Sequence, residues 1–219
     1  MSLVALFINL IDRSFGLYFW LSRKFARGSL FIAGAKLNIT GVENIEKGKV
    51  YVYVSNHSSM FDIPVIMGTV PNKASIVFKK ELSRIPVFGW QLVTGPYIMI
   101  DRTHPEKAMR SIEKGKKMME EKRISVILFA EGTRSKTDEV QPFKRGAFYL
   151  ASKVKFPIIP VSISGASSLL PKGSLALQKG TINIHFGEAI DTSHLHSKKD
   201  EIELMEIVRN TVIKNMVKK

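Results

Sequence analysis

The chain has 219 residues, enough for one sizeable domain with a short appendage, and 45% of them are apolar, as in an ordinary globular protein. It contains no cysteine, which excludes disulfides, thiolate zinc sites and a cysteine nucleophile. The formal net charge of +14 predicts an anionic partner: nucleic acid, an anionic membrane surface or a phosphorylated substrate.

The amino-terminal part is strongly apolar. Residues 2–21 are mostly apolar or aromatic, and Asp12 and Arg13 interrupt them. The interruption leaves no uncharged run of the about 18 residues that a membrane-spanning helix needs, and no basic residue precedes the run as in a secretory signal. Basic and aromatic residues lie together between Trp20 and Arg27, which is typical of a membrane interface.

We therefore predict a membrane-associating helical segment over residues 1–28, lying in the interface, followed by an α/β domain over residues 29–219. A spanning helix and a helix buried in the core are the alternatives. Because the sequence lacks a secretory signal, the expected location is the cytoplasmic face of the cell membrane, with a monotopic or single N-terminal anchor.

The rest of the chain alternates apolar runs with amphipathic stretches. Strands are expected within residues 30–42, as an edge strand, and at 50–54, 75–78, 95–100, 125–129, 156–164 and 180–186. Helices are expected near 62–69, in a short piece after the basic loop 79–90, from 103 to 119, near 145–153 and over 198–217. This alternation predicts an α/β fold with a mixed, largely parallel sheet flanked by helices.

The strand at 50–54 runs into a small polar loop that contains His57, and the next helix begins near Asp62. His57 would thus lie at the carboxyl end of a strand, where open α/β sheets place their chemistry. On one continuous helix, side chains five residues apart would diverge by roughly 140°. The two side chains can therefore meet only if His57 lies in the loop and the chain folds back. Asp62 would then fix the imidazole tautomer and leave the other nitrogen free as a base. The alternative is that Asp62 merely caps a helix.

Further polar residues follow other predicted strands. Lys79 and Lys80 follow one strand, Arg102 follows another, and the sequence Glu-Gly-Thr-Arg-Ser at 131–135 follows a third. Gly132 allows close approach of the backbone, and its neighbours offer hydrogen-bond donors suited to phosphate. Together these residues predict a base and several cations at one edge of the sheet.

In their order, these blocks resemble the glycerolipid acyltransferases, whose bacterial members acylate 1-acyl-sn-glycerol-3-phosphate (lysophosphatidic acid). The resemblance covers roughly residues 50–165 and rests on the blocks at 56–62 (N-H-x4-D), 79–89, 100–102, 129–135 and 158–161. Two features depart from the family pattern: Ala130 replaces a usual proline, and the segment before His57 is short.

The resemblance implies that His57 removes the proton from the sn-2 hydroxyl of the acceptor, while Asp62 orients the imidazole. The acceptor oxygen would attack the thioester of acyl-CoA or an acyl carrier protein directly, giving phosphatidic acid. A covalent acyl-enzyme through Ser58 or Ser59 is the competing mechanism. No cofactor is expected, because acyl-CoA or the acyl carrier protein enters as a substrate, and this chemistry requires no metal.

The acceptor phosphate needs cations. The resemblance assigns its pocket to Lys79, Lys80, Arg102, Glu131, Gly132, Thr133 and Arg134, with Glu131 expected to orient an arginine. The expected partners are lysophosphatidic acid, the acyl donor and an anionic membrane surface. Nucleic acid is excluded because the basic residues are dispersed and form no recognised module. The alternatives are glycerol-3-phosphate or another lysolipid as acceptor, or a non-catalytic basic protein that binds membranes.

Overall fold

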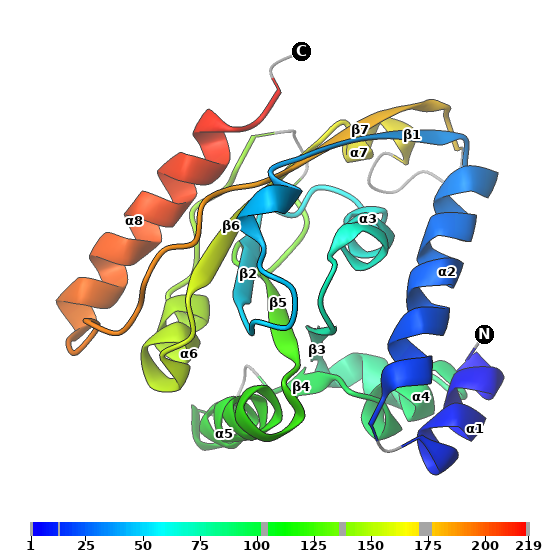
Figure 1. Ribbon diagram of the computed structural model, residues 1–219, viewed down its shortest axis with the longest axis horizontal. Coiled ribbons are helices and arrows are strands. Elements are labelled where there is room, and N and C mark those ends of the chain that lie inside the picture. Colours follow the sequence, from blue (N-terminus) through cyan, green and yellow to red (C-terminus); the bar gives the residue numbers. More distant parts are fainter. Residues whose placement is uncertain (1, 13, 102–104, 136–138, 171–176, 218–219) are drawn as a thin grey trace.

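The computed structural model describes residues 2–12, 14–101, 105–135, 139–170 and 177–217, which form a seven-stranded sheet in the order β1-β7-β6-β2-β5-β3-β4 (Figure 1). The strands are β1 (Ala35–Thr40), β2 (Val52–Ser55), β3 (Ala74–Lys79), β4 (Ile98–Ile100), β5 (Ser125–Phe129), β6 (Ile158–Ser164) and β7 (Gly180–Phe186). Strand β7 runs antiparallel to β6, and the other neighbouring pairs are parallel. The predicted mixed, largely parallel sheet is confirmed, including the edge position of β1.

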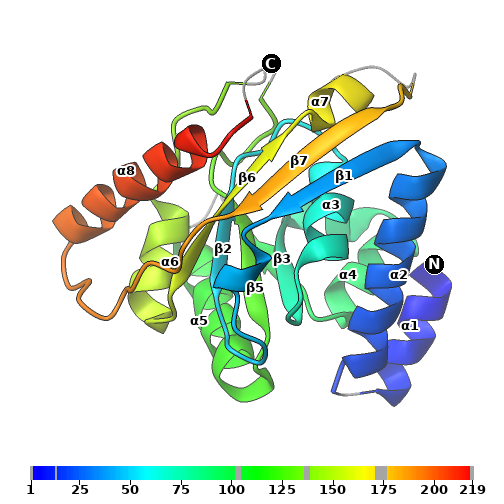
Figure 2. The ribbon, with the colours of Figure 1, turned by 45° about the horizontal axis from the view of Figure 1, so that its top comes forward.

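Helices cover both faces of the sheet (Figure 2). They are α1 (Ser2–Ile11), α2 (Gly16–Ile32), α3 (Asp62–Thr69), α4 (Phe88–Thr94), α5 (Pro105–Lys122), α6 (Gly146–Val154), α7 (Ala166–Leu169) and α8 (Lys198–Lys214), with short 3-10 turns η1 (Val42–Asn44) and η2 (Lys80–Arg84). The sequence predicts neither α7 nor η1.

The central strand β2 shows why both faces are covered. Along this strand and the residue before it, successive side chains enter different cores. Tyr51 and Tyr53 lie in the core beneath α1, α2 and α3, whereas Val52 and Val54 lie in the core beneath α5, α6 and α8. Successive strand residues point to opposite faces, and all four of these side chains are fully buried. A strand that is apolar on both faces is stable only between two layers of helices.

The amino-terminal segment forms two helices because Asp12 breaks the run between them. The backbone N–H of Leu17 donates to Asp12 Oδ2 (2.8 Å), and the backbone N–H of Ser14 donates to Asp12 Oδ1 (2.9 Å). The carboxylate thereby satisfies one amide group in the first turn of α2, that of Leu17, and one in the turn before it, that of Ser14. Nowhere in the described part of the chain is a helix both long enough and apolar enough to cross a membrane.

Helix α2 shares a core with the sheet. The predicted boundary at residue 28 falls inside α2, which continues to Ile32 and buries Tyr18, Phe19 and Leu30. This packing ties the helix to the α/β domain along its whole length.

Two basic residues of α2 have a structural partner. Arg23 Nη2 donates to the carbonyl oxygen of Val70 (2.8 Å), and Arg27 Nε donates to that of Gly68 (2.8 Å). These carbonyls lie at the end of α3, where cations are favoured by the helix dipole. The sequence pattern places Arg23 and Arg27 at a membrane edge; the structure shows that their guanidinium groups join α2 to α3.

Candidate active site

The loop that carries His57 leaves the sheet at a defined point. Pairing of β2 with β6 ends where Ser55 lies opposite Val161. Beyond it, the side chain of Asn56 takes over: Nδ2 donates to the carbonyl of Ile163 (2.8 Å), and Oδ1 accepts from the N–H of the same residue (2.9 Å). The Asn56 side chain thus pairs with the backbone N–H and C=O groups of β6 where the backbone of β2 turns away. Because Asn56 is only 2% exposed, losing these hydrogen bonds would leave buried polar groups without a partner.

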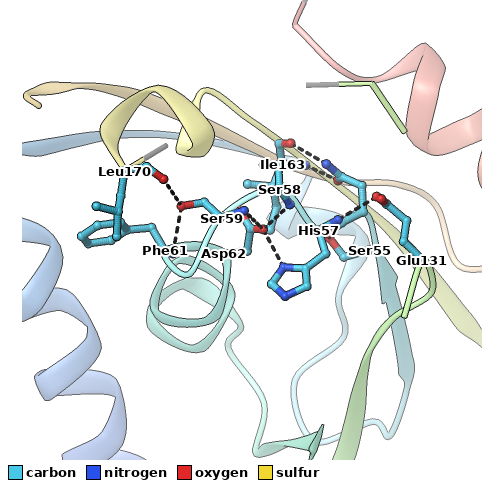
Figure 3. Close-up of polar contacts among 10 residues, drawn as sticks. Ser55, His57, Ser58, Ser59, Phe61, Asp62, Glu131, Ile163 and Leu170 are labelled. Atoms are coloured by element: carbon cyan, nitrogen blue, oxygen red, sulfur yellow. Dashed lines mark hydrogen bonds and ion pairs between the residues drawn. The ribbon is translucent and has the colours of Figure 1, made fainter. Parts of the chain in front are cut away.

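His57 and Asp62 meet as the spacing predicts. The imidazole Nδ1 lies 2.8 Å from Asp62 Oδ2, which also accepts the backbone N–H groups of Ser58 (2.7 Å) and Ser59 (2.8 Å) (Figure 3). The Asp62 side chain is fully buried, and that of His57 is 15% exposed. Because an ionised carboxylate only accepts hydrogen bonds, Nδ1 carries the proton and Nε2 is left as a base. Asp62 therefore orders the loop and orients the ring at once.

The two serines after His57 are poorly placed as nucleophiles. Ser58 and Ser59 are 6% and 1% exposed. The Ser59 hydroxyl faces Leu170, to whose carbonyl it donates (3.4 Å), and accepts the N–H of Phe61 (3.3 Å) (Figure 3). Neither serine lines the cavity beside the imidazole.

The segment after β5 packs on His57. The backbone N–H of His57 donates to Glu131 Oε1 (2.8 Å), and its carbonyl accepts the N–H of Ser135 (2.8 Å). The ring of Phe129 stacks on the imidazole, with centroids 4.2 Å apart and planes 23° apart. Gly132 has φ of +73°, a left-handed conformation that glycine adopts without strain, and so turns the loop back.

Glu131 is 3% exposed, and this burial raises its pKa to about 7, although the hydrogen bond from the His57 amide acts in the opposite direction. The carboxyl group thus lies behind the His57 backbone. The sequence predicts that this carboxyl orients an arginine of the pocket; the hydrogen bond in the structure joins it to His57.

A cavity of about 740 Å³ opens beside His57. Its polar lining includes Lys79, Thr133, Arg134 and Lys144. Its apolar lining comes from β3, β4, β5, α5 and α6 and includes Ile76, Phe78, Ile98, Ile112, Leu128 and Leu150. The cavity therefore offers cations and hydrocarbon-compatible walls within one space, which suits an anionic amphiphile.

The predicted pocket residues divide into groups. Lys79 and residues 132–134 line the same cavity as His57. Lys80 is absent from the lining, and its Nζ pairs with Asp101 Oδ2 at 3.1 Å. Arg102 lies outside the described residues. Within the described ranges, no group of three or more histidine, aspartate or glutamate side chains could hold a metal ion.

The site also contains residues that the predicted set omits. Lys144 lines the cavity, Phe129 stacks on His57, and Asn56 anchors its loop. The sequence places Lys144 shortly after the polar residues 131–135 but assigns it no role, and Phe129 has the pattern of an ordinary strand residue. Asn56 was visible only as part of the N-H-x4-D block.

Comparison with known proteins identifies the family. The sequence matches the family model named Acyltransferase over residues 36–164, more than half of the chain. It is 32% identical to a 1-acyl-sn-glycerol-3-phosphate acyltransferase of Cocos nucifera over 170 residues, and 32% identical to one of Saccharomyces cerevisiae over 183 residues. The matches cover 78% and 82% of this chain but only 54% and 59% of the respective relatives.

A solved structure agrees with the sequence match. The crystal structure of the 1-acyl-sn-glycerophosphate (LPA) acyltransferase PlsC from Thermotoga maritima aligns with a TM-score of 0.79 at 27% identity. The alignment covers 99% of this chain and 89% of that one, so both helical layers and the sheet are shared. The chain belongs to the Acyltransferase family.

Proposed function

We propose that the protein transfers an acyl group from acyl-CoA or an acyl carrier protein to the sn-2 hydroxyl of 1-acyl-sn-glycerol-3-phosphate, giving phosphatidic acid. The observation that carries this proposal is the His57–Asp62 pair, with Nδ1 and Oδ2 2.8 Å apart, beside a cavity with both cationic and apolar walls. Proteins that this chain resembles, among them that of Thermotoga maritima, bear the name of this activity.

In the proposed mechanism, the oxygen of the acceptor hydroxyl bonds to the carbonyl carbon of the thioester, and His57 Nε2 accepts the proton of that hydroxyl. Asp62 stabilises the imidazolium that forms. The carbon–sulfur bond then breaks, and the departing thiolate takes the proton held by His57. General base catalysis of this kind contributes about 10²–10⁴-fold to the rate.

The cavity supports an acceptor with a phosphate head and a hydrocarbon chain. The cavity is lined by Lys79, Arg134 and Lys144, whose positive charges would attract the acceptor phosphate with its charge of about −2. Side chains such as Ile98 and Leu150 would contact an acyl chain, whose burial contributes about 0.8 kcal/mol for each methylene.

The decisive experiment measures thiol release from an acyl thioester in the presence of detergent-dispersed lysophosphatidic acid. Wild type should release thiol only when the acceptor is present, and His57→Ala should reduce the rate by at least about 100-fold. His194→Ala is the matched control, because His194 also lies near an aspartate (Nδ1 to Asp191 Oδ2, 3.8 Å) but is 65% exposed. Release without acceptor, or equal rates in both variants, would refute the proposal.

The same assay separates the competing mechanism and the competing acceptors. A Ser58→Ala/Ser59→Ala variant should keep turnover within about tenfold of wild type if transfer is direct, since neither hydroxyl lines the cavity. A loss as complete as that of His57→Ala would favour an acyl-serine. Glycerol-3-phosphate and lysolipids with other head groups, run in parallel, identify the acceptor.

The membrane part of the proposal is supported by exposed apolar side chains on α1 and α4, which pack side by side (Figure 1). The most exposed are Leu3 (69%), Phe7 (66%), Ile11 (69%) and Trp90 (57%). Large exposed apolar patches on soluble domains mark interaction sites, and the net charge of +14 suits an anionic bilayer. We propose attachment at the cytoplasmic face of the cell membrane through this patch.

Vesicle binding tests the attachment. A Phe7→Ser/Trp90→Ser variant should bind vesicles of anionic phospholipid several-fold more weakly than wild type, because two apolar anchors are lost. Ile207→Ser is the matched control, since Ile207 is 47% exposed on α8, on the far side of the molecule from α1 (Figure 1). Equal binding by all three proteins would remove α1 and α4 from the attachment surface.

A further inference from the structure

The segment after β5 separates into two parts with different surroundings. Gly132, Thr133 and Arg134 line the cavity, whereas Glu131 is 3% exposed and is absent from the lining. Its Oε1 accepts the backbone N–H of His57 at 2.8 Å (Figure 3). Glu131, the one acidic residue among residues 131–135, is therefore turned toward the base and away from the cavity.

We propose that Glu131 is a positioning residue for His57 and does not bind the acceptor phosphate. This inference rests on the proposed function, in which His57 is the general base. A carboxyl oxygen bonded to the His57 amide holds the peptide that carries the imidazole, so Glu131 acts on the reaction through His57.

The surrounding contacts show that the loop is held from both ends. Ser55 O accepts the N–H of Ala130 (3.0 Å), and His57 O accepts the N–H of Ser135 (2.8 Å). The Glu131–His57 bond lies between these two backbone bonds and is the only one of the three made by a side chain. It is therefore the contact that a substitution can remove while the others remain.

Charge argues against a phosphate ligand at this position. A carboxylate would repel a phosphate dianion, whereas cations and neutral donors attract it. Burial is the largest influence on the Glu131 carboxyl and raises its pKa to about 7, as expected for a group that lies outside the cavity lining. The backbone N–H groups of His57 and Gln141 lower this pKa, the nearby Asp62 raises it, and Arg209 lowers it.

Kinetics of Glu131→Ala and Glu131→Gln test the inference. Glu131→Ala should lower kcat about 100-fold, because a misplacement of about 1 Å costs that much, while the acceptor KM stays within about twofold. Glu131→Gln keeps an oxygen for the His57 amide and should retain kcat within about fivefold. A rise in acceptor KM with kcat retained would place Glu131 at the phosphate and overturn the inference, as would equal kcat losses in both variants.

Glu201→Ala is the matched control for a general loss of stability. Glu201 is also a buried glutamate, 7% exposed, whose Oε1 accepts from Ser152 Oγ (2.9 Å) between α6 and α8. This variant should lower the thermal midpoint yet keep kcat. If it reduced kcat as strongly as Glu131→Ala, the effect would be one of stability and the positioning role would be refuted.

Amide hydrogen exchange supplies a readout that needs no substrate. The His57 amide should exchange at least about tenfold faster in Glu131→Ala than in wild type, because its acceptor is lost, and near the wild-type rate in Glu131→Gln. Unchanged exchange in Glu131→Ala would refute the hydrogen bond. If wild type proved inactive toward every acceptor, the proposed function would fail, and exchange would still decide whether Glu131 holds His57.

Discussion

Replacing Asp62 by asparagine would separate the two tasks of its carboxylate. Oδ2 accepts the backbone N–H groups of Ser58 and Ser59 as well as the Nδ1–H of His57. In Asp62→Asn the amide oxygen should take this position, because an NH₂ group there would face three donors. Geometry and tautomer are then kept, and the negative charge beside the imidazolium is lost.

The magnitude follows from that charge. Two unit charges about 4 Å apart interact by about 4 kcal/mol at an effective dielectric constant of about 20. Part of this energy is kept by the neutral hydrogen bond, so we expect transition-state stabilisation to fall by about 2–4 kcal/mol. This corresponds to a decrease in kcat of about 30- to 1,000-fold. Asp62→Ala should lose more, since the imidazole is then also free to turn.

The two variants should differ in stability as well. Asp62→Ala leaves the N–H groups of Ser58 and Ser59 buried without an acceptor, at a cost of about 1–3 kcal/mol each. A loss of about 2–6 kcal/mol would lower the thermal midpoint by about 4–24 °C for a chain of this size. In Asp62→Asn the oxygen still accepts both bonds, but the NH₂ group takes the position of Oδ1, which is buried without a partner among the described residues. Asp62→Asn should therefore also be destabilised, yet less than Asp62→Ala, because one polar group and not two is left unpaired.

Calorimetry and the thiol-release assay on the same preparations test this reasoning. The expected pattern is a large loss of kcat in both variants and a larger loss of stability in Asp62→Ala than in Asp62→Asn. Turnover of Asp62→Asn within threefold of wild type would show that the imidazolium does not depend on the charge. Equal midpoints for Asp62→Ala and Asp62→Asn would show that the carboxylate does not hold the loop.

Three further predictions follow from single contacts. Arg134→Ala should raise the acceptor KM with little change in kcat; an unchanged KM would remove Arg134 from the acceptor pocket. Asn56→Ala should destabilise the fold by about 2–4 kcal/mol in urea unfolding, because both backbone groups of Ile163 lose their partner. The control Asn38→Ala, which loses one exposed side-chain bond, should cost under about 0.5 kcal/mol, and equal losses would contradict the role of Asn56. Burial raises the pKa of Glu131 to about 7, so between about pH 5 and 7 this carboxyl is protonated in the folded protein but ionised in the unfolded chain. The free energy of unfolding should therefore fall as the pH rises from about 5 to 8. Wild type should lose about 2–3 kcal/mol more than Glu131→Gln over this range; parallel profiles would contradict the raised pKa.

Much of the fold was predictable because its signals are local. A strand such as β5 is a continuous apolar run, and α8 begins at Lys198, directly after Ser197, which forms a capping box with Asp200. The short α7, at Ala166–Leu169, gives no periodic signal over so few residues. The sequence predicts one helical segment over residues 1–28, interrupted in its apolar run by Asp12. The separation into α1 and α2, and the backbone partners of Asp12, become visible only in the structure.

Arg23 and Arg27 have a structural role that local composition does not reveal. Basic residues beside aromatic ones have the same pattern at a membrane edge and at a helix–helix contact. Their carbonyl partners, at Val70 and Gly68, lie more than 40 residues away in the sequence. Only the packing of α2 against α3 shows that the two guanidinium groups join these helices.

The His57–Asp62 pair was determined by the sequence itself, because a strand end, a short loop and a helix start leave few geometries for residues five positions apart. The role of Glu131 was decided by tertiary structure. Its partner, the amide of His57, is 74 residues away and becomes a neighbour because β2 and β5 pair in parallel and end at the same edge. The short covalent spacing limits the geometry of the His57–Asp62 contact. The contact between Glu131 and His57 instead depends on the order of strands in the sheet, which burial of both sheet faces determines.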